Sequence, residues 1–245
     1  MMHRFFTDKQ NVIDGRIAIY GEDVKHISKV LRLSIGDIVC ICDGDCMEYI
    51  SKISSIESDC VYLTIEDKQN SQTESLCKVD LYQGLPKAGR LETIIQKCVE
   101  LGVNRIVPFQ AERSVAKAEP KDFTRKLERY NRVAYEAAKQ SKRGRIPKLA
   151  HMHTLSDIGF SMYDKLIVAY EDEKDMTLKR AMIDIPSDAS IAVFIGPEGG
   201  FTPGEIDFLR RRGAVAVSLG ARILRTETAG MAMLAMIMYE MESRV

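Results

Sequence analysis

The first part of the chain alternates between apolar and polar residues over short stretches, which is the pattern of half-buried β-strands. Strands are predicted at Arg16 to Tyr20, Asp37 to Cys42, Glu48 to Ile53 and Val61 to Ile65. One helix is predicted between the first two strands, because Glu22 and Asp23 supply a capping start. Its apolar face comprises His26, Ile27, Val30 and Leu31. A small β-barrel is the natural closure of strands of this kind.

A polar stretch then separates two parts of the chain. From Asp67 to Ser75 the sequence is almost wholly polar, and we place a domain boundary there. The prediction is a barrel domain over residues 1–72 and a second domain over residues 73–245.

After the boundary, strands and helices alternate. Leu91, Ile94, Ile95 and Cys98 follow the spacing of a helix that stops at Gly102. Strands are predicted at Val79 to Gln83, Arg105 to Val107, Lys165 to Tyr170, Ser190 to Ile195 and Ala214 to Leu219. A long helix follows Pro120, and others begin near Thr177, Pro203 and Glu227. This alternation predicts an α/β domain with a mostly parallel sheet covered on both faces.

The last helix is apolar nearly all round from Ala229 to Tyr239 and rich in methionine. A helix without a polar stripe is buried, either inside its own domain or against a second copy of the chain. We favour the dimer interface.

Composition limits the classes of function. The chain has 245 residues, with 35 Lys and Arg against 35 Asp and Glu, so its formal net charge is +0. This balance excludes a globally basic protein that coats nucleic acid, although a segregated basic face remains open. The hydrophobic content of 45% indicates a globular protein rather than a disordered one.

We expect a cytoplasmic protein without a metal. The stretch from Met1 to Asp8 lacks the long apolar run that is typical of a secretory signal. The longest apolar run of the chain is shorter than the roughly 20 residues that a helix needs to span a bilayer. A cytoplasmic location implies that the cysteines are reduced and mostly buried, and the absence of a Cys-x-x-Cys pair argues against a metal site. The cysteines are Cys40, Cys42, Cys46, Cys60, Cys77 and Cys98.

The strongest local signal is a glycine-rich turn, Gly196 to Gly200, after the strand that ends at Ile195. A helix follows it, with Thr202 as N-cap, Pro203 at the first position and Glu205 completing a capping box. Glycines at the carboxyl end of a parallel strand let backbone amides approach a ligand, although a tight structural turn is the alternative. Neither Gly-x-x-x-x-Gly-Lys-Ser/Thr nor Gly-x-Gly-x-x-Gly is present, which favours a nucleoside-type ligand without a pyrophosphate.

A second loop, Leu219 to Ala229, also follows a predicted strand. It carries the apolar pair Ile223 and Leu224 before a helix start at Thr226. Apolar loop residues are expected to cover a flat apolar group such as adenine; core packing beneath the loop is the alternative. Two such loops on one sheet predict a single cleft.

Basic residues gather in the long helix after Pro120. From Lys121 to Lys148 there are ten Lys or Arg against three acids. An apolar face of Phe123, Leu127, Tyr130, Ala134 and Ala137 lies opposite part of this stripe. A solvated helix face and a track for a phosphate backbone are both open. His151 and His153 have no identifiable partner, so no role is assigned to them.

The motifs together resemble a known family over nearly the whole chain. The chain is similar to the bacterial methyltransferases that modify the third ring nitrogen of a uridine in 16S ribosomal RNA, members of the SPOUT or trefoil-knot superfamily. The two most specific stretches are Gly196 to Phe201 and Leu219 to Ala229. Supporting stretches are Met2 to Phe6, His26 to Arg32, Lys87 to Gly102, Glu112 to Ser114 and Glu136 to Arg143 with Pro147.

The resemblance implies an N-terminal PUA-like barrel, a knotted C-terminal domain, a homodimer and bound S-adenosylmethionine. The knot could not be derived from the pattern, because knots are rare. The implied cofactor contacts are Gly196, Glu198, Gly199, Leu219, Gly220, Ile223, Leu224, Arg225, Thr226 and Ala229. We expect a side chain at Gly199 to occupy space that the cofactor needs. Lys139 and Lys142 depart from the family pattern, which more often has an acid and a glycine there.

The implied substrate is ribosomal RNA of the small subunit, with the target base unpaired because its pairing edge reacts. Arg4, Arg113 and Arg225 are the candidates for orienting the base or its phosphates. Glu227 either acts as the general base that removes the proton from the ring nitrogen or only places a favourable negative charge at the start of a helix. The expected RNA-binding residues are His3, Arg4, Lys29, Arg32, Lys121, Arg125, Arg132, Lys139 and Arg143. The main alternative function is that of a non-catalytic RNA-binding protein. A nucleotide-dependent dehydrogenase or kinase is disfavoured, because the chain lacks the phosphate-binding motifs of those enzymes.

Overall fold

The computed structural model describes residues 2–87, 89–116 and 120–244, which form two compact units. The first contains the residues up to Glu74 together with Ala138–Ile146, and the second contains Ser75–Ala137 and Pro147–Val245. The division at Glu74 lies within the polar stretch that the sequence indicated. The inclusion of residues 138–146 in the first unit was not predicted.

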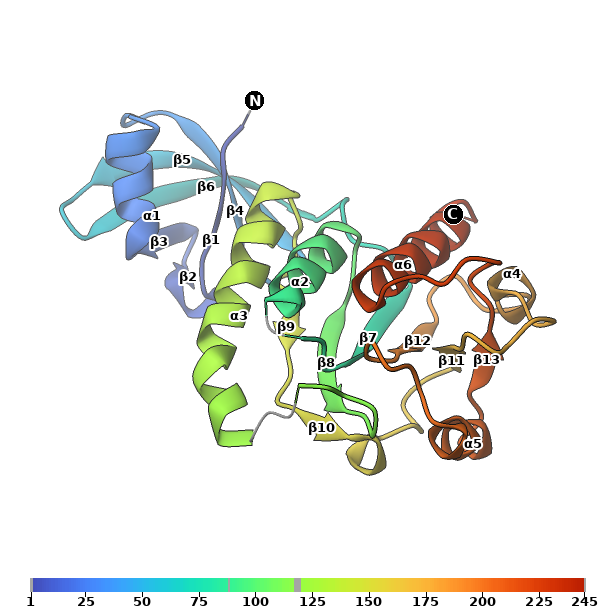
Figure 1. The fold of residues 1–245 in the computed structure, drawn as a ribbon. Coiled ribbons are helices and arrows are strands. Elements are labelled where there is room, and N and C mark those ends of the chain that lie inside the picture. Colours follow the sequence, from blue (N-terminus) through green and yellow to red (C-terminus); the bar gives the residue numbers. More distant parts are fainter. Residues whose placement is uncertain (1, 88, 117–119, 245) are drawn as a thin grey trace. The chain divides into compact units, whose positions relative to one another are not determined.

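The first unit is built on a six-stranded sheet with the order β1-β4-β5-β6-β3-β2 (Figure 1). Its strands are β1 (Arg4–Phe6), β2 (Val12–Ile13), β3 (Arg16–Tyr20), β4 (Ile38–Cys42), β5 (Met47–Ile56) and β6 (Cys60–Asn70). The four predicted strands are confirmed, and β1 and β2 were missed. The β5–β6 hairpin is longer than predicted and extends to the pair Met47 and Asn70. Backbone hydrogen bonds between the antiparallel strands continue there although the residues no longer alternate between apolar and polar.

A short helix packs in this unit at the predicted place. Helix α1 (Glu22–Lys25) continues directly into the π-helix η2 (His26–Val30), and a 3-10 turn, η1 (Lys9–Asn11), precedes β2. Ile27 of η2 is fully buried in a core with Phe5, Ile41 and Leu63. Of the predicted apolar face, Ile27 is buried and His26 and Leu31 are partly buried, but Val30 is 68% exposed and Val24, which was not predicted, is buried instead.

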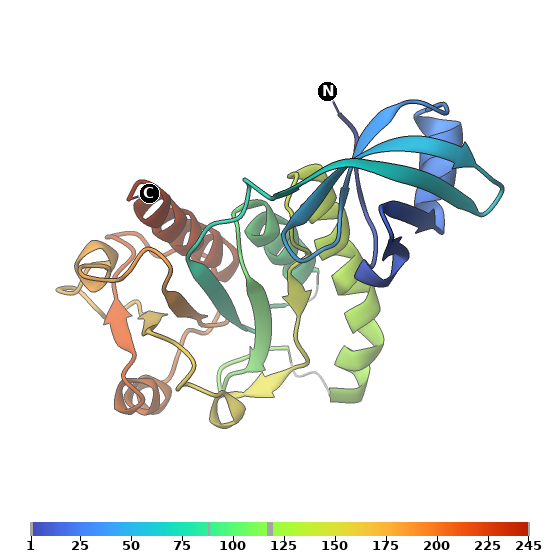
Figure 2. The ribbon, with the colours of Figure 1, turned by 180° about the vertical axis from the view of Figure 1, so that it is seen from behind.

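The second unit contains a seven-stranded sheet in which all pairings between described strands are parallel. The order is β10-β8-β7-β12-β11-β13, with β9 beside β8. The strands are β7 (Lys78–Gly84), β8 (Arg105–Gln110), β9 (Lys148–Leu149), β10 (His153–Thr154), β11 (Lys165–Ala169), β12 (Ser190–Ile195) and β13 (Val215–Val217). Figure 2 shows the same strands from behind. The predicted parallel sheet is confirmed.

Helices cover both faces of this sheet. They are α2 (Arg90–Glu100), α3 (Pro120–Gln140), α4 (Leu178–Ala181), α5 (Pro203–Arg211) and α6 (Thr226–Glu242), with a 3-10 turn, η3 (Leu155–Asp157). Helices α2 and α6 pack together beside β7 and β12. On the other face, Ile206 and Leu209 of α5 join Phe194 of β12 and Phe109 of β8 in one core. The two predicted loops begin at the carboxyl ends of β12 and β13, at one edge of this sheet.

Helix α6 is mostly buried within the second unit. Met233, Leu234 and Ile237 are at most 1% exposed, whereas Met236 and Tyr239 are 42% and 78% exposed. In the described part of the chain, no helix combines the length and the apolar character that crossing a membrane requires.

The six cysteines are free thiols, and all except Cys46 are buried. Burial raises the pKa of Cys98 to about 12. The prediction that the cysteines are mostly buried is therefore confirmed.

Candidate active site

The two predicted loops meet at one edge of the parallel sheet. Strand β11 lies between β12 and β13, so the loops that leave these two strands flank the end of β11 (Figure 1). They enclose a cavity of about 460 Å³, a size typical of sites for small ligands. The first loop contributes Gly196, Pro197, Glu198 and Gly200 to its lining, and the second contributes Ser218, Leu219, Gly220, Arg222, Ile223, Leu224, Arg225 and Thr226.

Nine of the ten residues expected to contact the cofactor line this cavity, and the exception is Gly199, which is not part of the lining. A Cβ atom added at Gly199 would lie 2.8 Å from the backbone oxygen of Arg113, which is too close for two non-bonded atoms. A substitution there would therefore disturb the packing of the first loop on Arg113. The loss of cofactor binding expected for a side chain at Gly199 stays a prediction, but its physical reason becomes displacement of the first loop rather than occupation of the cofactor's space.

The first loop is a tight turn that favours glycine. Gly200 has a φ of +66°, and its N–H donates to the Pro197 carbonyl at 2.9 Å. An added Cβ at Gly200 would also overlap the Glu171 carboxylate. After the turn, Thr202 and Glu205 form the predicted capping box, with N–H to side-chain oxygen distances of 3.2 and 2.8 Å.

A buried hydroxyl ties the two loops together. Thr226 is 4% exposed, and its Oγ1 donates to the Gly196 carbonyl at 2.6 Å while accepting from Gln83 Nε2 at 2.8 Å. Gln83 lies in β7 and is fully buried. Sequence reasoning did not assign Gln83 a role, although a glutamine at the end of an apolar strand is a signal that could have found it.

Opposite charges are paired at one side of the cavity. Arg90 Nη1, at the start of α2, lies 3.0 Å from Glu198 Oε1 and 3.4 Å from Glu227 Oε2. The backbone N–H of Lys87 also donates to Glu198 Oε1 at 3.0 Å. Arg90 therefore links the first loop to the start of α6, and this link was not predicted.

The three arginines proposed for catalysis occupy different places. Arg225 precedes α6 and lines the cavity. Arg113 donates from Nη1 to the carbonyls of Gly199 and Phe201, both at 3.3 Å, so it supports the first loop from outside the lining. Arg4 lies in the first unit.

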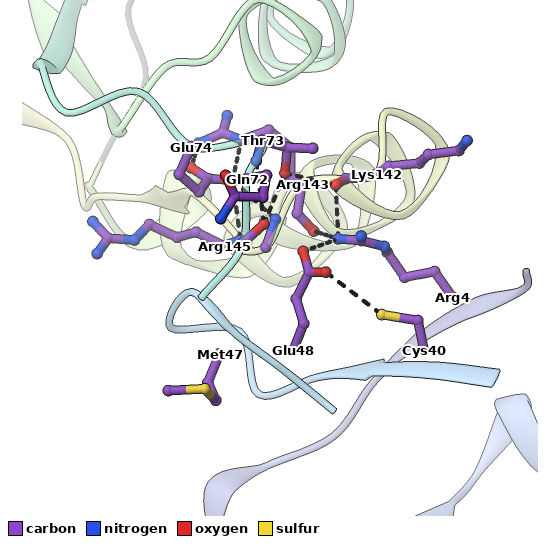
Figure 3. Close-up of polar contacts among 12 residues, drawn as sticks. Arg4, Cys40, Met47, Glu48, Gln72, Thr73, Glu74, Lys142, Arg143 and Arg145 are labelled. Carbon is purple, nitrogen blue, oxygen red and sulfur yellow. Dashed lines mark hydrogen bonds and ion pairs between the residues drawn. The ribbon is translucent and has the colours of Figure 1, made fainter. Parts of the chain in front are cut away.

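Arg4 and Glu74 hold a turn at residues 142–145 (Figure 3). Arg4 Nη1 lies 2.9 Å from Glu48 Oε1 and donates to the Lys142 carbonyl at 2.8 Å. Glu74 accepts two bonds from Arg143, at 2.8 and 2.6 Å, and one from the Gly144 N–H at 2.9 Å. Bidentate pairs of this kind fix geometry as well as charge.

Burial separates the expected RNA-binding residues into two groups. Arg143 is 4% exposed, and Lys139 Nζ lies 2.5 Å from Asp23 Oδ1 and 5.2 Å from the centre of the Phe5 ring. Together with Arg4, these two cations are matched inside the first unit and do not form part of an exposed stripe. The exposed members are His3, Lys29, Arg32, Lys121, Arg125 and Arg132.

The opposite side of α3 has the predicted apolar character. Phe123, Ala134 and Ala137 are buried, and Leu127 and Tyr130 are partly buried. Arg125, on the other side, makes an ion pair with Asp122 at 3.3 Å while its side chain stays 81% exposed. The helix is therefore amphipathic, and the spacing in the sequence predicted which side is buried.

Comparison with known proteins identifies the class. Residues 73–238 match the RNA methyltransferase domain, and residues 19–66 match the RNA methyltransferase PUA domain. The RNA methyltransferase match therefore covers most of the second unit, which contains the parallel sheet and the cavity.

Whole-chain relatives narrow the class further. The chain is 37% identical to ribosomal RNA small subunit methyltransferase E of Bacillus subtilis, over 98% of both chains, and 30% identical to the protein of that name in Synechocystis, over 99% of this chain and 79% of the relative. The crystal structure of the Neisseria gonorrhoeae methyltransferase E bound to S-adenosyl methionine has a TM-score of 0.83 and 27% identity, with 98% of each chain covered. The chain belongs to the ribosomal RNA small subunit methyltransferase E family.

Proposed function

We propose that this protein transfers a methyl group from S-adenosylmethionine to N3 of a uridine in 16S ribosomal RNA of the small subunit. The single observation that carries the proposal is the cavity that the two motif loops line together. Its volume suits a nucleoside ligand, and its glycine turn has no phosphate-loop spacing. The names of the whole-chain relatives and the ligand of the Neisseria structure support methylation of small-subunit ribosomal RNA with S-adenosylmethionine as the donor.

The lining fits this cofactor. Ile223 is 82% exposed and Leu224 is partly exposed, so both offer apolar surface to an adenine ring. Gly220 has a φ of +113° and no atom within 4 Å of a Cβ built on it, which leaves room for a ligand to approach the backbone, whereas Gly196 packs closely against Gly200 and Phe201 within the first loop. When bound, the cofactor supplies an electrophilic methyl group on its sulfonium. The protein aligns donor and acceptor, and alignment alone contributes several kcal/mol, on the order of 7–11 in well-oriented systems.

The acceptor nitrogen carries a proton that must leave when N3 is methylated. A cation near the uracil oxygens stabilises the anion that forms. Among the three arginines we assign this role to Arg225, because it lines the cavity. Arg113 acts through the Gly199 and Phe201 carbonyls, and Arg4 through the turn at residues 142–145; both are positioning residues in this proposal.

RNA is held by the exposed basic residues of each unit. His3, Lys29 and Arg32 serve in the first unit, and Lys121, Arg125 and Arg132 serve in the second. The chain acts in the cytoplasm as a homodimer, in which the exposed Met236 and Tyr239 of α6 contribute apolar contact surface. We further propose that the loop from Leu219 to Thr226 is part of a trefoil knot, as in the family that the chain resembles.

Methyl incorporation tests this proposal. Purified protein is incubated with S-adenosylmethionine labelled on the methyl group and with either free 16S ribosomal RNA or assembled small subunits. Mass spectrometry of nuclease digests then identifies the modified nucleoside. The proposal predicts 3-methyluridine at one position. A protein that binds RNA without incorporation would be the non-catalytic rival, and label at another ring atom would contradict the assignment to N3.

A further inference from the structure

Glu171 stands at the end of the strand between the two cavity loops. Strand β11 ends at Ala169, and the Tyr170 N–H that follows donates to the Val217 carbonyl of β13 at 3.1 Å. Glu171 comes next and belongs to the cavity lining. Because β11 lies between β12 and β13, its carboxyl end is at the middle of the edge from which the two loops leave.

The carboxylate of Glu171 reaches the first loop without being engaged there. One of its oxygens occupies the space beside the Gly200 Cα where any other residue would carry a Cβ. Among the residues that the structure describes, the Glu171 carboxylate takes part in no hydrogen bond or ion pair, and the residue is exposed. An acceptor pair therefore faces the cavity with its hydrogen-bonding capacity unused.

The neighbouring carboxylates have other partners. Asp172 accepts from the Tyr170 hydroxyl at 3.0 Å, a bond that raises the pKa of this phenol. Glu173 accepts from the N–H groups of Asp175 and Met176, both at 3.1 Å. In the lining itself, Glu198 is paired with Arg90 through Oε1, while its Oε2 is buried without a hydrogen-bond partner. Glu171 is thus the exposed carboxylate of the described lining, and both of its oxygens are without a protein partner there.

We propose that Glu171 accepts hydrogen bonds from the two ribose hydroxyls of the cofactor and makes the site selective for a ribonucleoside. The inference rests on the proposed function. The ribose is the middle of S-adenosylmethionine, between the adenine and the methionine chain, and Glu171 holds the middle position between the two loops. Two adjacent hydroxyls match two carboxylate oxygens, and an acid after a neighbouring strand performs the same task in dinucleotide-binding sheets.

Calorimetry with the product S-adenosylhomocysteine tests the assignment. We expect Glu171→Ala to weaken binding by about 10- to 100-fold, the range for hydrogen bonds to a charged group. Asp175→Asn is the matched control, because it removes a negative charge from an exposed residue of the same segment outside the lining, and it should bind within about twofold of the wild type. Thermal unfolding of the variants checks that they fold.

Two analogues separate the ribose from the ammonium group. Methylthioadenosine keeps the ribose and lacks the amino-acid chain, so Glu171→Ala should weaken its binding by the same factor. The 3′-deoxy analogue of S-adenosylhomocysteine should bind weakly to the wild type, with little further loss in Glu171→Ala. If the substitution weakens binding of S-adenosylhomocysteine and leaves binding of methylthioadenosine unchanged, Glu171 binds the ammonium group of the amino-acid chain and the inference is wrong.

If the substitution changes the binding of neither ligand, the inference is also wrong, while tight binding of these ligands by the wild type would still support the proposed function. A wild-type protein that binds neither ligand would instead contradict the proposed function itself.

Discussion

At the scale of single residues, Lys142 has a backbone conformation that lysine rarely adopts. Its φ is +59°, in the left-handed region, and two donors hold its carbonyl: Arg4 Nη1 at 2.8 Å and Thr73 Oγ1 at 2.9 Å. The resemblance implied that the family more often has glycine at this position, and this φ gives such a preference a physical reason. Sequence reasoning detected the departure but could not assign it to backbone strain, because φ is not visible in residue spacing.

Replacing Lys142 by glycine should therefore stabilise the protein. Relief of left-handed strain is worth about 1 kcal/mol, less the entropy that glycine gains in the unfolded chain. Urea unfolding measures the change in the free energy of unfolding. The control is Lys126→Gly within α3, where the residue is exposed and helical, and glycine should destabilise by roughly 1 kcal/mol. A Lys142→Gly variant as unstable as this control would show that the turn carries no strain.

At the scale of elements, the sequence identified most strands and helices of both units. It did not predict β1, because three residues give too little alternation to recognise, nor the pairing of β1 with β4. The motif loops were assigned to one cleft because each follows a strand of the same parallel sheet. The hydroxyl that joins them was predicted only as a cofactor contact, since its partner Gln83 is 143 residues away.

Thr226→Val tests the connection between the two loops. Valine keeps the shape of threonine but removes the hydroxyl, which leaves the Gly196 carbonyl and the Gln83 amide without this partner in a buried place. We expect a loss of about 1–3 kcal/mol in the free energy of unfolding, together with weaker cofactor binding. Thr228→Val, on an exposed position of the same helix, should change neither quantity appreciably. Equal effects of the two substitutions would argue against a bridging role for Thr226.

At the scale of the whole molecule, the division into two units was predicted but the path of the chain was not. Residues 138–146 belong to the first unit, and the contacts responsible join distant positions: Arg143 with Glu74, and Arg4 with Lys142. Pairs of this kind leave no periodic signal. For the same reason the sequence counted Arg4, Lys139 and Arg143 as RNA contacts, although their charges are matched by carboxylates within the unit.

The account as a whole depends on one cavity in the second unit. The glycine turn, the apolar loop, Arg225 and Glu171 act together only if the cofactor occupies the space that they line. A crystal structure of the protein grown with S-adenosylhomocysteine measures this directly. We predict density for the nucleoside between residues 196–200 and 219–226, with its ribose beside Glu171. Density for the nucleoside at any other place on the chain, with this cavity filled only by solvent, would contradict the account.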